Sequence, residues 1–127
     1  MPEKHLYEYA VIRLVPRVER EEFLNVGVIL YSQSLKFLGI QYHINHDKLQ
    51  HFADHSDIEE VEEYLKAFEE ICRGSAAGGT IGKLDIASRF RWLTATRSTI
   101  VQSSKVHSGF CSDPEEDLKK LFNQFVL

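Results

Sequence analysis

The chain contains only two cysteines among its 127 residues, and they do not form a C-x-x-C pair. Cys72 and Cys111 lie far apart in the sequence, so a disulfide framework, a zinc knuckle or a dithiol redox site has no support. We expect both to be reduced thiols, with Cys72 buried. Long apolar runs are also missing: no stretch approaches the ~20 residues of a membrane span, and no secretory apolar segment follows Met1. We therefore expect a cytoplasmic protein without a membrane partner.

A large excess of charge of one sign is absent as well, because the net charge is −4 at pH 7. The contents of 43% apolar and 27% charged residues match ordinary globular proteins and exclude a disordered chain. Residues 1–127 have the length of one domain. A protein that coats nucleic acid non-specifically usually carries a basic total. A protein partner or an anionic ligand is therefore favoured over a nucleic acid.

The charges that are present are unevenly distributed. Residues 57–70 contain seven acids against Lys66 alone, whereas residues 83–105 contain five bases against Asp85 alone. Three of those bases are arginines that stand close to Phe90 and Trp92 in the run 88–99, S-R-F-R-W-L-T-A-T-R-S-T. Guanidinium groups suit phosphate or carboxylate, and Trp offers a flat face for a base or for an arginine.

A second group of arginines lies near the N-terminus. Arg13 has the same parity as Tyr7 and Tyr9 in an expected strand, so its face is not simply exposed to solvent. It requires a partner, which is either an acid such as Glu22 or a bound phosphate or carboxylate. Together the two regions form the candidate binding surface, which comprises Arg13, Arg17, Arg89, Arg91, Trp92 and Arg97. The alternative is intramolecular pairing of these arginines, for instance with the acidic segment 57–70.

Hydrophobic periodicity predicts a mixed fold. Residues 26–32 are apolar on both alternating faces, as in a central strand covered on both sides, and Gly27 marks a bulge or close packing. The strand that follows is expected to form a hairpin with it. Residues 98–103 are expected to form the last strand, and an irregular stretch continues to Ser112. The expected strands cover 7–15, 26–32, 37–44 and 98–103.

Capping residues and apolar spacing predict the helices. Asn45 is expected to cap the first, Ser56 with Glu59 forms a capping box for the second, and Asp113 with Pro114 begins the last. The glycine-rich residues 74–82 are expected to form a flexible loop. The expected helices cover 46–55, 57–73, 85–95 and the segment from 114 onward. The order β-β-β-α-α-α-β-α predicts a single-domain α+β fold with an antiparallel sheet of about four strands covered by helices.

Motifs that specify a reaction are missing. Gly82-Lys83 is not a phosphate loop, because Ala77 stands where the first glycine belongs and Leu84 where the hydroxyl belongs. His51 and His55 have metal-binding spacing, but no third ligand is dictated, so we expect no metal and no cofactor. Catalytic residues cannot be assigned.

Three blocks resemble a known bacterial family, the domain of unknown function 3037 family. They are residues 7–16 (YEYAVIRLVP), 22–31 (EFLNVGVILY) and 89–102 (RFRWLTATRSTIVQ), followed by V-H-S-G at 106–109. The resemblance spans nearly the whole chain and implies a single fold of bacterial cytoplasmic origin, without catalytic residues to transfer. Such proteins are often encoded beside HipA-like kinases, which implies an accessory or partner role.

The favoured function is therefore a non-catalytic binding or protein-interaction module with an arginine-rich anion-recognition surface. One alternative is an enzyme for a phosphorylated or nucleic-acid substrate, with the arginines stabilising anionic charge and His107 acting as acid or base. Another is a single-stranded nucleic-acid binder in which Trp92 stacks on bases.

Overall fold

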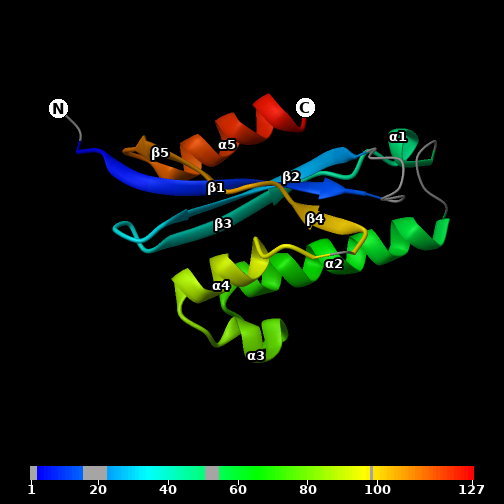
Figure 1. Ribbon diagram of the computed structural model, residues 1–127, viewed down its shortest axis with the longest axis horizontal. Helices are drawn as coiled ribbons and strands as arrows, with labels where there is room; N and C mark the ends of the chain where they lie inside the picture. Colours follow the sequence, from blue (N-terminus) through cyan, green and yellow to red (C-terminus); the bar gives the residue numbers. More distant parts are fainter. Residues whose placement is uncertain (1–2, 16–22, 51–54, 98) are drawn as a thin grey trace.

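The computed structural model describes residues 3–15, 23–50, 55–97 and 99–127. Within them, five strands form one antiparallel sheet with helices on both faces, so the predicted α+β class is confirmed (Figure 1). None of the helices in these residues is both long and apolar enough to cross a membrane. In chain order the elements are β1 (His5–Leu14), β2 (Leu24–Ser32), β3 (Phe37–Tyr42), α1 (His46–Gln50), α2 (His55–Arg73), the 3₁₀ turn η2 (Ala76–Gly78), α3 (Gly79–Gly82), α4 (Ile86–Leu93), β4 (Val101–Ser103), β5 (His107–Cys111) and α5 (Pro114–Phe125).

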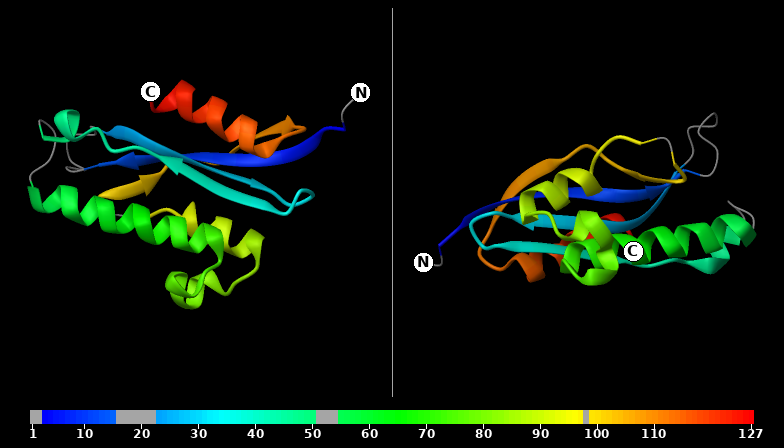
Figure 2. Two further views of the ribbon diagram at one scale, coloured as in Figure 1. Left: turned by 180° about the vertical axis from the view of Figure 1, so that it is seen from behind. Right: turned by 90° about the horizontal axis from the view of Figure 1, so that it is seen from below.

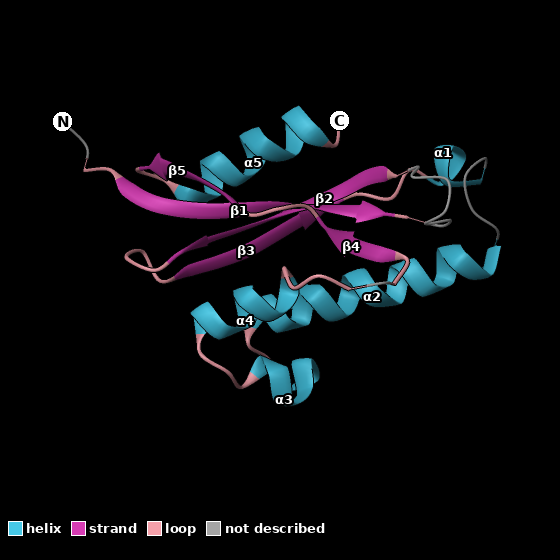
Figure 3. Cartoon of the chain, viewed as in Figure 1, coloured by secondary structure: helices cyan, strands magenta, loops and turns pink. Residues whose placement is uncertain are grey.

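The sheet has the order β3-β2-β1, and the remaining edge of β1 pairs with both β4 and β5. β4 pairs with the C-terminal end of β1, and β5 pairs with its N-terminal half. Figure 2 shows α2, α3 and α4 on one face of the sheet and α5 on the other. Figure 3 shows the strands as a single layer between these helices.

β2 is the central strand, as predicted, and its side chains enter two separate cores. Ile29 and Tyr31 point into the core beneath α2 and α4, while Val28 and Leu30 point into the core beneath α5. The pairing of β2 with β3 confirms the predicted hairpin. Both faces of β2 are therefore covered, which accounts for its nearly continuous apolar sequence.

Gly27 lies beside a bulge, and neighbouring backbone approaches it closely, as predicted. Ile12 pairs with Gly27 but Arg13 pairs with Asn25, so Val26 is the extra residue on β2. A Cβ atom on Gly27 would lie 2.9 Å from Cβ of Tyr42, closer than real side chains approach. The bulge shifts the register between β1 and β2 at this position, and the glycine lets β3 pack closely against β2.

The predicted helix starts are confirmed at three positions. Asn45 Oδ1 accepts from Lys48 N at 3.1 Å, and Asp85 accepts from Ser88 N at 2.7 Å. Asp113 accepts from the amides of Glu115 and Glu116, with Pro114 at the first helical position. In the described residues the second helix, α2, begins at His55, one residue before the predicted cap Ser56. The predicted end of the first helix, residues 51–54, lies outside the described residues.

The prediction that residues 74–82 form a flexible loop is wrong, because η2 and α3 occupy most of it. Ser75 Oγ donates to the carboxylate of Glu70 at 2.5 Å, which ties this segment back to α2. A Cβ on Gly82 would lie 3.0 Å from the carbonyl oxygen of Ser75. At that position glycine therefore serves close packing rather than flexibility.

The sheet also differs from the prediction near the C-terminus. The stretch expected to be irregular up to Ser112 contains β5, and the expected strand 98–103 is a strand only over Val101–Ser103. The sequence H-S-G-F-C of β5 shows no alternation of apolar and polar residues. Its strand conformation comes from pairing with β1, where Leu6 stands opposite Phe110.

Candidate functional site

Arg89 is held by backbone carbonyl groups at the end of α2. Its Nη1 donates to the carbonyl oxygens of Ile71 at 2.9 Å and Cys72 at 3.0 Å, and its Nε donates to that of Leu84 at 3.1 Å. The last carbonyls of a helix lack partners within the helix and carry its partial negative charge. The guanidinium group therefore satisfies and stabilises the end of α2.

The same helix end has the hydrogen bonds of a Schellman motif around Gly74. Gly74 N donates to Ile71 O at 3.1 Å and Ser75 N donates to Glu70 O at 3.3 Å. Gly74 has φ +67°, a conformation that suits glycine, and a Cβ there would lie 2.9 Å from Nη1 of Arg89. The absence of a side chain at Gly74 therefore leaves room for the guanidinium group of Arg89.

Arg91 lies on the outer side of α4 and reaches across to β1. Its Nη2 donates to both carboxylate oxygens of Glu8, at 2.8 and 3.2 Å. The side chain of Arg91 is exposed and that of Glu8 is half-buried. Hydrogen bonds of this kind fix the position of a guanidinium group and contribute little to stability when exposed.

Arg97 and Trp92 form a third, separate contact against α2. The guanidinium carbon of Arg97 lies 4.5 Å from the Trp92 ring centroid and 5.4 Å from that of Phe68. Arg97 Nη2 also donates to the backbone carbonyl oxygen of Trp92. Burial lowers the pKa of Arg97 below its ordinary value. Trp92 is 38% exposed and meets Phe68 edge to face.

The structure does not gather the predicted arginines into one site. Arg89 binds the end of the acidic helix through carbonyls, Arg91 binds Glu8 on β1, and Arg97 stacks on Trp92. The intramolecular contacts that the sequence left open are therefore present, although Arg89 uses backbone oxygens and Arg91 uses an acid outside α2.

Arg13 lies on the other face of the sheet, beside Asn25, its partner on β2. Its guanidinium carbon lies 4.4 Å from the centroid of the Phe23 ring. Arg13 Nε and Asn25 Oδ1 are both buried, and neither has a hydrogen-bond partner among the described residues. The prediction that the face of Arg13 is not simply solvent is confirmed. The predicted site residue Arg17 and the suggested partner Glu22 lie outside the described residues.

A group of exposed apolar side chains, not anticipated from the sequence, lies beside Arg91. Leu6 on β1 and Phe110 on β5 stand directly opposite each other and are 53% and 65% exposed. Directly opposite residues point to the same face, which here is the face of Glu8 and Arg91. We call Leu6, Phe110 and Arg91 the β1–β5 patch. Next to it is a hollow of about 460 Å³, lined by Leu6, Tyr7, Glu8, Tyr31, Gln33, Ser34 and Arg91.

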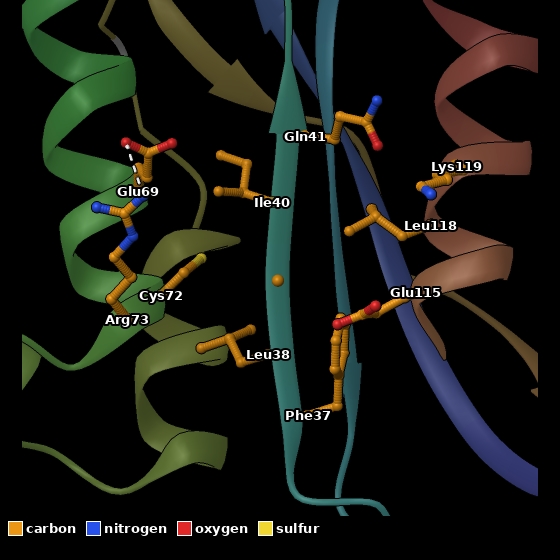
Figure 4. A pocket seen from close by; sticks show the side chains of 11 residues that line it. Phe37, Leu38, Ile40, Gln41, Glu69, Cys72, Arg73, Glu115, Leu118 and Lys119 are labelled. Atoms are coloured by element: carbon orange, nitrogen blue, oxygen red, sulfur yellow. Dashed lines mark ion pairs between the residues drawn. The ribbon is translucent and has the colours of Figure 1, made fainter. Parts of the chain in front are cut away.

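A second hollow of about 350 Å³ runs along the outer side of β3. In Figure 4, β3 passes between Glu69, Cys72 and Arg73 of α2 on one side and Glu115, Leu118 and Lys119 of α5 on the other. We call this hollow the β3 groove. In the sequence this groove is indicated by the lack of charged residues in F-L-G-I-Q-Y, the second strand of the predicted hairpin.

His107, the residue considered for acid-base catalysis, lies apart from the arginines of α4. His107 stands opposite Tyr9, with the two ring centroids 5.4 Å apart, on the face that α5 covers. Burial raises the pKa of the Cys72 thiol to about 12 and also raises the pKa of Cys111. Nucleophilic cysteines need the opposite shift. Among the described side chains, no three of His, Cys, Asp and Glu could hold a metal ion.

The chain belongs to the family described as protein of unknown function (DUF3037), whose model matches residues 9–126. This confirms the resemblance drawn from the three sequence blocks. No curated protein and no solved structure is similar enough to the chain to count as a match.

Proposed function

We propose that this family member is a non-catalytic protein-interaction module of the cytoplasm that binds its partner through the β1–β5 patch. The observation that carries the proposal is the exposed pair Leu6 and Phe110, of which Leu6 lines the same hollow as Arg91. Large apolar side chains that gather on a surface commonly mark contacts with other proteins. Aromatic residues and arginine are also enriched where such contacts are strongest.

Glu8 adds to the case because it holds Arg91 in place before a partner arrives. Two hydrogen bonds to one carboxylate restrict the guanidinium group, so less side-chain entropy is lost on binding. The ion pair stands at the margin of the hollow that Leu6 lines. An apolar side chain of the partner fits against Leu6 and Phe110, while a polar group of the partner fits beside the ion pair.

The positions of the titratable groups favour binding over the enzymatic alternative. An acid-base role for His107 with the arginines requires both in one pocket. Instead His107 faces the α5 side of the sheet opposite Tyr9, and Arg91 faces the α4 side. Arg13 lies farther along β1, opposite Gln102. The stacking alternative is also disfavoured, because one face of the Trp92 ring is taken by Arg97.

The family resemblance suggests a HipA-like kinase as the partner. The test is calorimetric titration of such a kinase with the wild-type chain and with a Leu6→Ser/Phe110→Ser variant. We expect the double substitution to weaken binding at least ~30-fold, because truncating central apolar contacts costs about 2 kcal/mol or more. Arg91→Ala is expected to weaken it by about tenfold.

The matched control is Leu127→Ser, which removes another exposed leucine, 74% exposed, from the opposite face of the molecule. It should bind like the wild type. Equal binding by all variants would assign the kinase contact to another surface. Absence of binding even by the wild-type chain would remove the kinase as the partner.

Recognition of an anion is a second candidate, supported by the buried Nε of Arg13, which has no hydrogen-bond partner in the described part of the chain. Titration with inorganic phosphate, followed by chemical shifts of backbone amides, tests it. Saturable shifts around Arg13 that vanish in Arg13→Met but persist in Arg97→Met would support this role. Linear shifts in all proteins would exclude it.

A further inference from the structure

The outer edge of β3 carries backbone groups that do not face β2. His43 N donates to Val26 O at 2.8 Å, and the register continues without a shift along β3. In an antiparallel pair the hydrogen-bonded positions alternate, so Gly39 and Gln41 bond to β2. The N–H and C=O groups of Leu38 and Ile40 therefore point away from β2. Among the described residues, β2 is the only strand that pairs with β3.

β3 also lacks the features that usually protect an open edge. Its sequence F-L-G-I-Q-Y contains no charged residue and no proline, and its pairing with β2 contains no bulge. The opposite edge differs, because Ser104, Lys105 and Val106 interrupt it between β4 and β5. Among the described strands, β3 is therefore the one edge that offers a regular template for another strand.

The walls of the β3 groove carry charges in a particular order. Along α2, Glu69 and Arg73 lie together as an ion pair, with Arg73 Nη2 3.7 Å from Glu69 Oε1, as Figure 4 shows. Along α5 the charges are separated, with Lys119 toward Gln41 and Glu115 toward Phe37. The α5 wall therefore presents a base and an acid at opposite ends of the same stretch of β3.

This order is self-complementary. A twofold axis perpendicular to the sheet, placed beside the middle of β3, reverses the direction of the strand and keeps each face on its own side. Lys119 then faces Glu115 of the second copy, and Glu115 faces Lys119 of the second copy. A second copy of this chain therefore supplies the charge match twice across the axis.

We propose that β3 pairs antiparallel with β3 of a second copy of this chain, with Ile40 near the twofold axis, so that one sheet continues through both copies. Leu38 and Ile40 supply the backbone hydrogen bonds across the axis. Glu115 and Lys119 of α5 fix the register, which an apolar strand specifies weakly on its own. This contact is independent of the β1–β5 patch.

The first test measures dimerisation together with the hydrogen exchange of individual backbone amides. Sedimentation equilibrium of the chain between about 1 and 300 µM measures dimerisation, and hydrogen exchange measured by NMR is run at both ends of that range. We expect a dimer in which the amides of Leu38 and Ile40 exchange more slowly as concentration rises. The amides of Gly39 and Gln41 serve as the internal control, because β2 protects them in the monomer.

The second test uses charge reversal and rescue on α5. In Glu115→Lys a lysine faces Lys119 of the second copy, and in Lys119→Glu two acids face each other. Each is expected to raise the dimer dissociation constant about tenfold at low salt, since the repulsion occurs twice across the axis. The double variant Glu115→Lys/Lys119→Glu restores opposite charges and should return the constant to near the wild-type value. Unfolding curves of all three variants check that the monomer is intact.

The remaining outcomes each decide against the proposal. A chain that is monomeric throughout, with freely exchanging Leu38 and Ile40 amides, overturns it. So does a dimer in which those amides stay unprotected, because another surface then associates. Protection that appears only when a HipA-like kinase is added would assign the edge to that partner instead. Leu6→Ser/Phe110→Ser should leave dimerisation unchanged, so this result and that for the β1–β5 patch can be told apart.

Discussion

At the scale of single residues, Arg89 stabilises the fold through the hydrogen bonds of its guanidinium group to the end of α2. It donates three hydrogen bonds to carbonyl oxygens, two of them at the last turn of that helix. We predict that Arg89→Ala lowers the free energy of unfolding by about 2–4 kcal/mol, because charged donors are lost and carbonyls are left without partners. Urea unfolding followed by circular dichroism measures the change.

Arg91→Ala is the matched control for this prediction, since it removes an arginine two residues away. The exposed pair of Arg91 with Glu8 is expected to contribute less than about 1 kcal/mol. Arg89→Lys keeps the charge but not the planar fork, and should fall between the two. Equal losses for Arg89→Ala and Arg91→Ala would show that the helix end does not depend on Arg89.

These arginines make separate contacts, which explains why the sequence predicted the segment but not its contacts. The concentration of charge at Arg89, Arg91 and Arg97 is visible in the sequence. The acceptors of Arg89 are backbone carbonyls, which no pattern of side chains displays. Leu6 and Phe110 escaped notice for a related reason, because only the pairing of β1 with β5 brings them together.

At the scale of elements, prediction succeeded where local signals agreed. Asp113 and Pro114 begin α5 as expected, because a capping side chain and a fixed φ act within one turn. β5 was missed because its strand conformation depends on β1, about a hundred residues earlier. The turns within 74–82 were missed because glycine signals both flexibility and close packing, and the sequence alone does not separate the two.

The join between β4 and β5 gives an element-scale prediction. Ser104 is buried there, and its Oγ accepts from Val11 N at 2.8 Å while Ser104 N donates to Val11 O. Ser104→Ala leaves the amide of Val11 without an acceptor, so we expect a loss of about 1–3 kcal/mol in the free energy of unfolding.

Ser103→Ala supplies the comparison for Ser104→Ala in the same denaturation experiment. The Ser103 hydroxyl donates to Ser104 O from a half-buried position, and solvent can replace that bond. Its loss should cost less than about 1 kcal/mol. If the two variants were equally stable, the join between β4 and β5 would not depend on the hydroxyl of Ser104. Hydrogen exchange of the Val11 amide should also accelerate in Ser104→Ala alone.

At the scale of the whole molecule, one sheet separates two cores and two proposed surfaces. α2 and α4 cover one core, α5 covers the other, and the β1–β5 patch and the β3 groove lie at opposite margins of the sheet. The α+β class followed from the order of elements in the sequence. Which edge of the sheet stays open could not be predicted from the sequence, because it depends on where β4 and β5 pair with β1.

A cysteine thiol and three tyrosine hydroxyls have raised pKa values in this fold, and they make the free energy of unfolding depend on pH in the alkaline range. Burial raises the pKa of Cys72 from 9.0 to about 12, and it is also the main cause of the raised pKa values of Tyr7, Tyr31 and Tyr42. In the unfolded chain these groups regain their ordinary pKa values. Between about pH 9 and 12 the unfolded state therefore binds fewer protons than the folded state, and stability falls as pH rises.

We predict that the free energy of unfolding is steady below about pH 9 and then falls, with Cys72 alone contributing up to about 1.4 kcal/mol per pH unit. Urea unfolding between about pH 8 and 11 measures it, at one protein concentration because dimerisation would add to stability. Cys72→Ala removes the titrating thiol, so its decline should be shallower than that of the wild type although its stability at pH 8 is lower. A wild-type stability that stays constant or rises up to pH 11 would contradict the raised pKa values. Parallel slopes for the two proteins would attribute the decline to the tyrosines, whose pKa values are also raised.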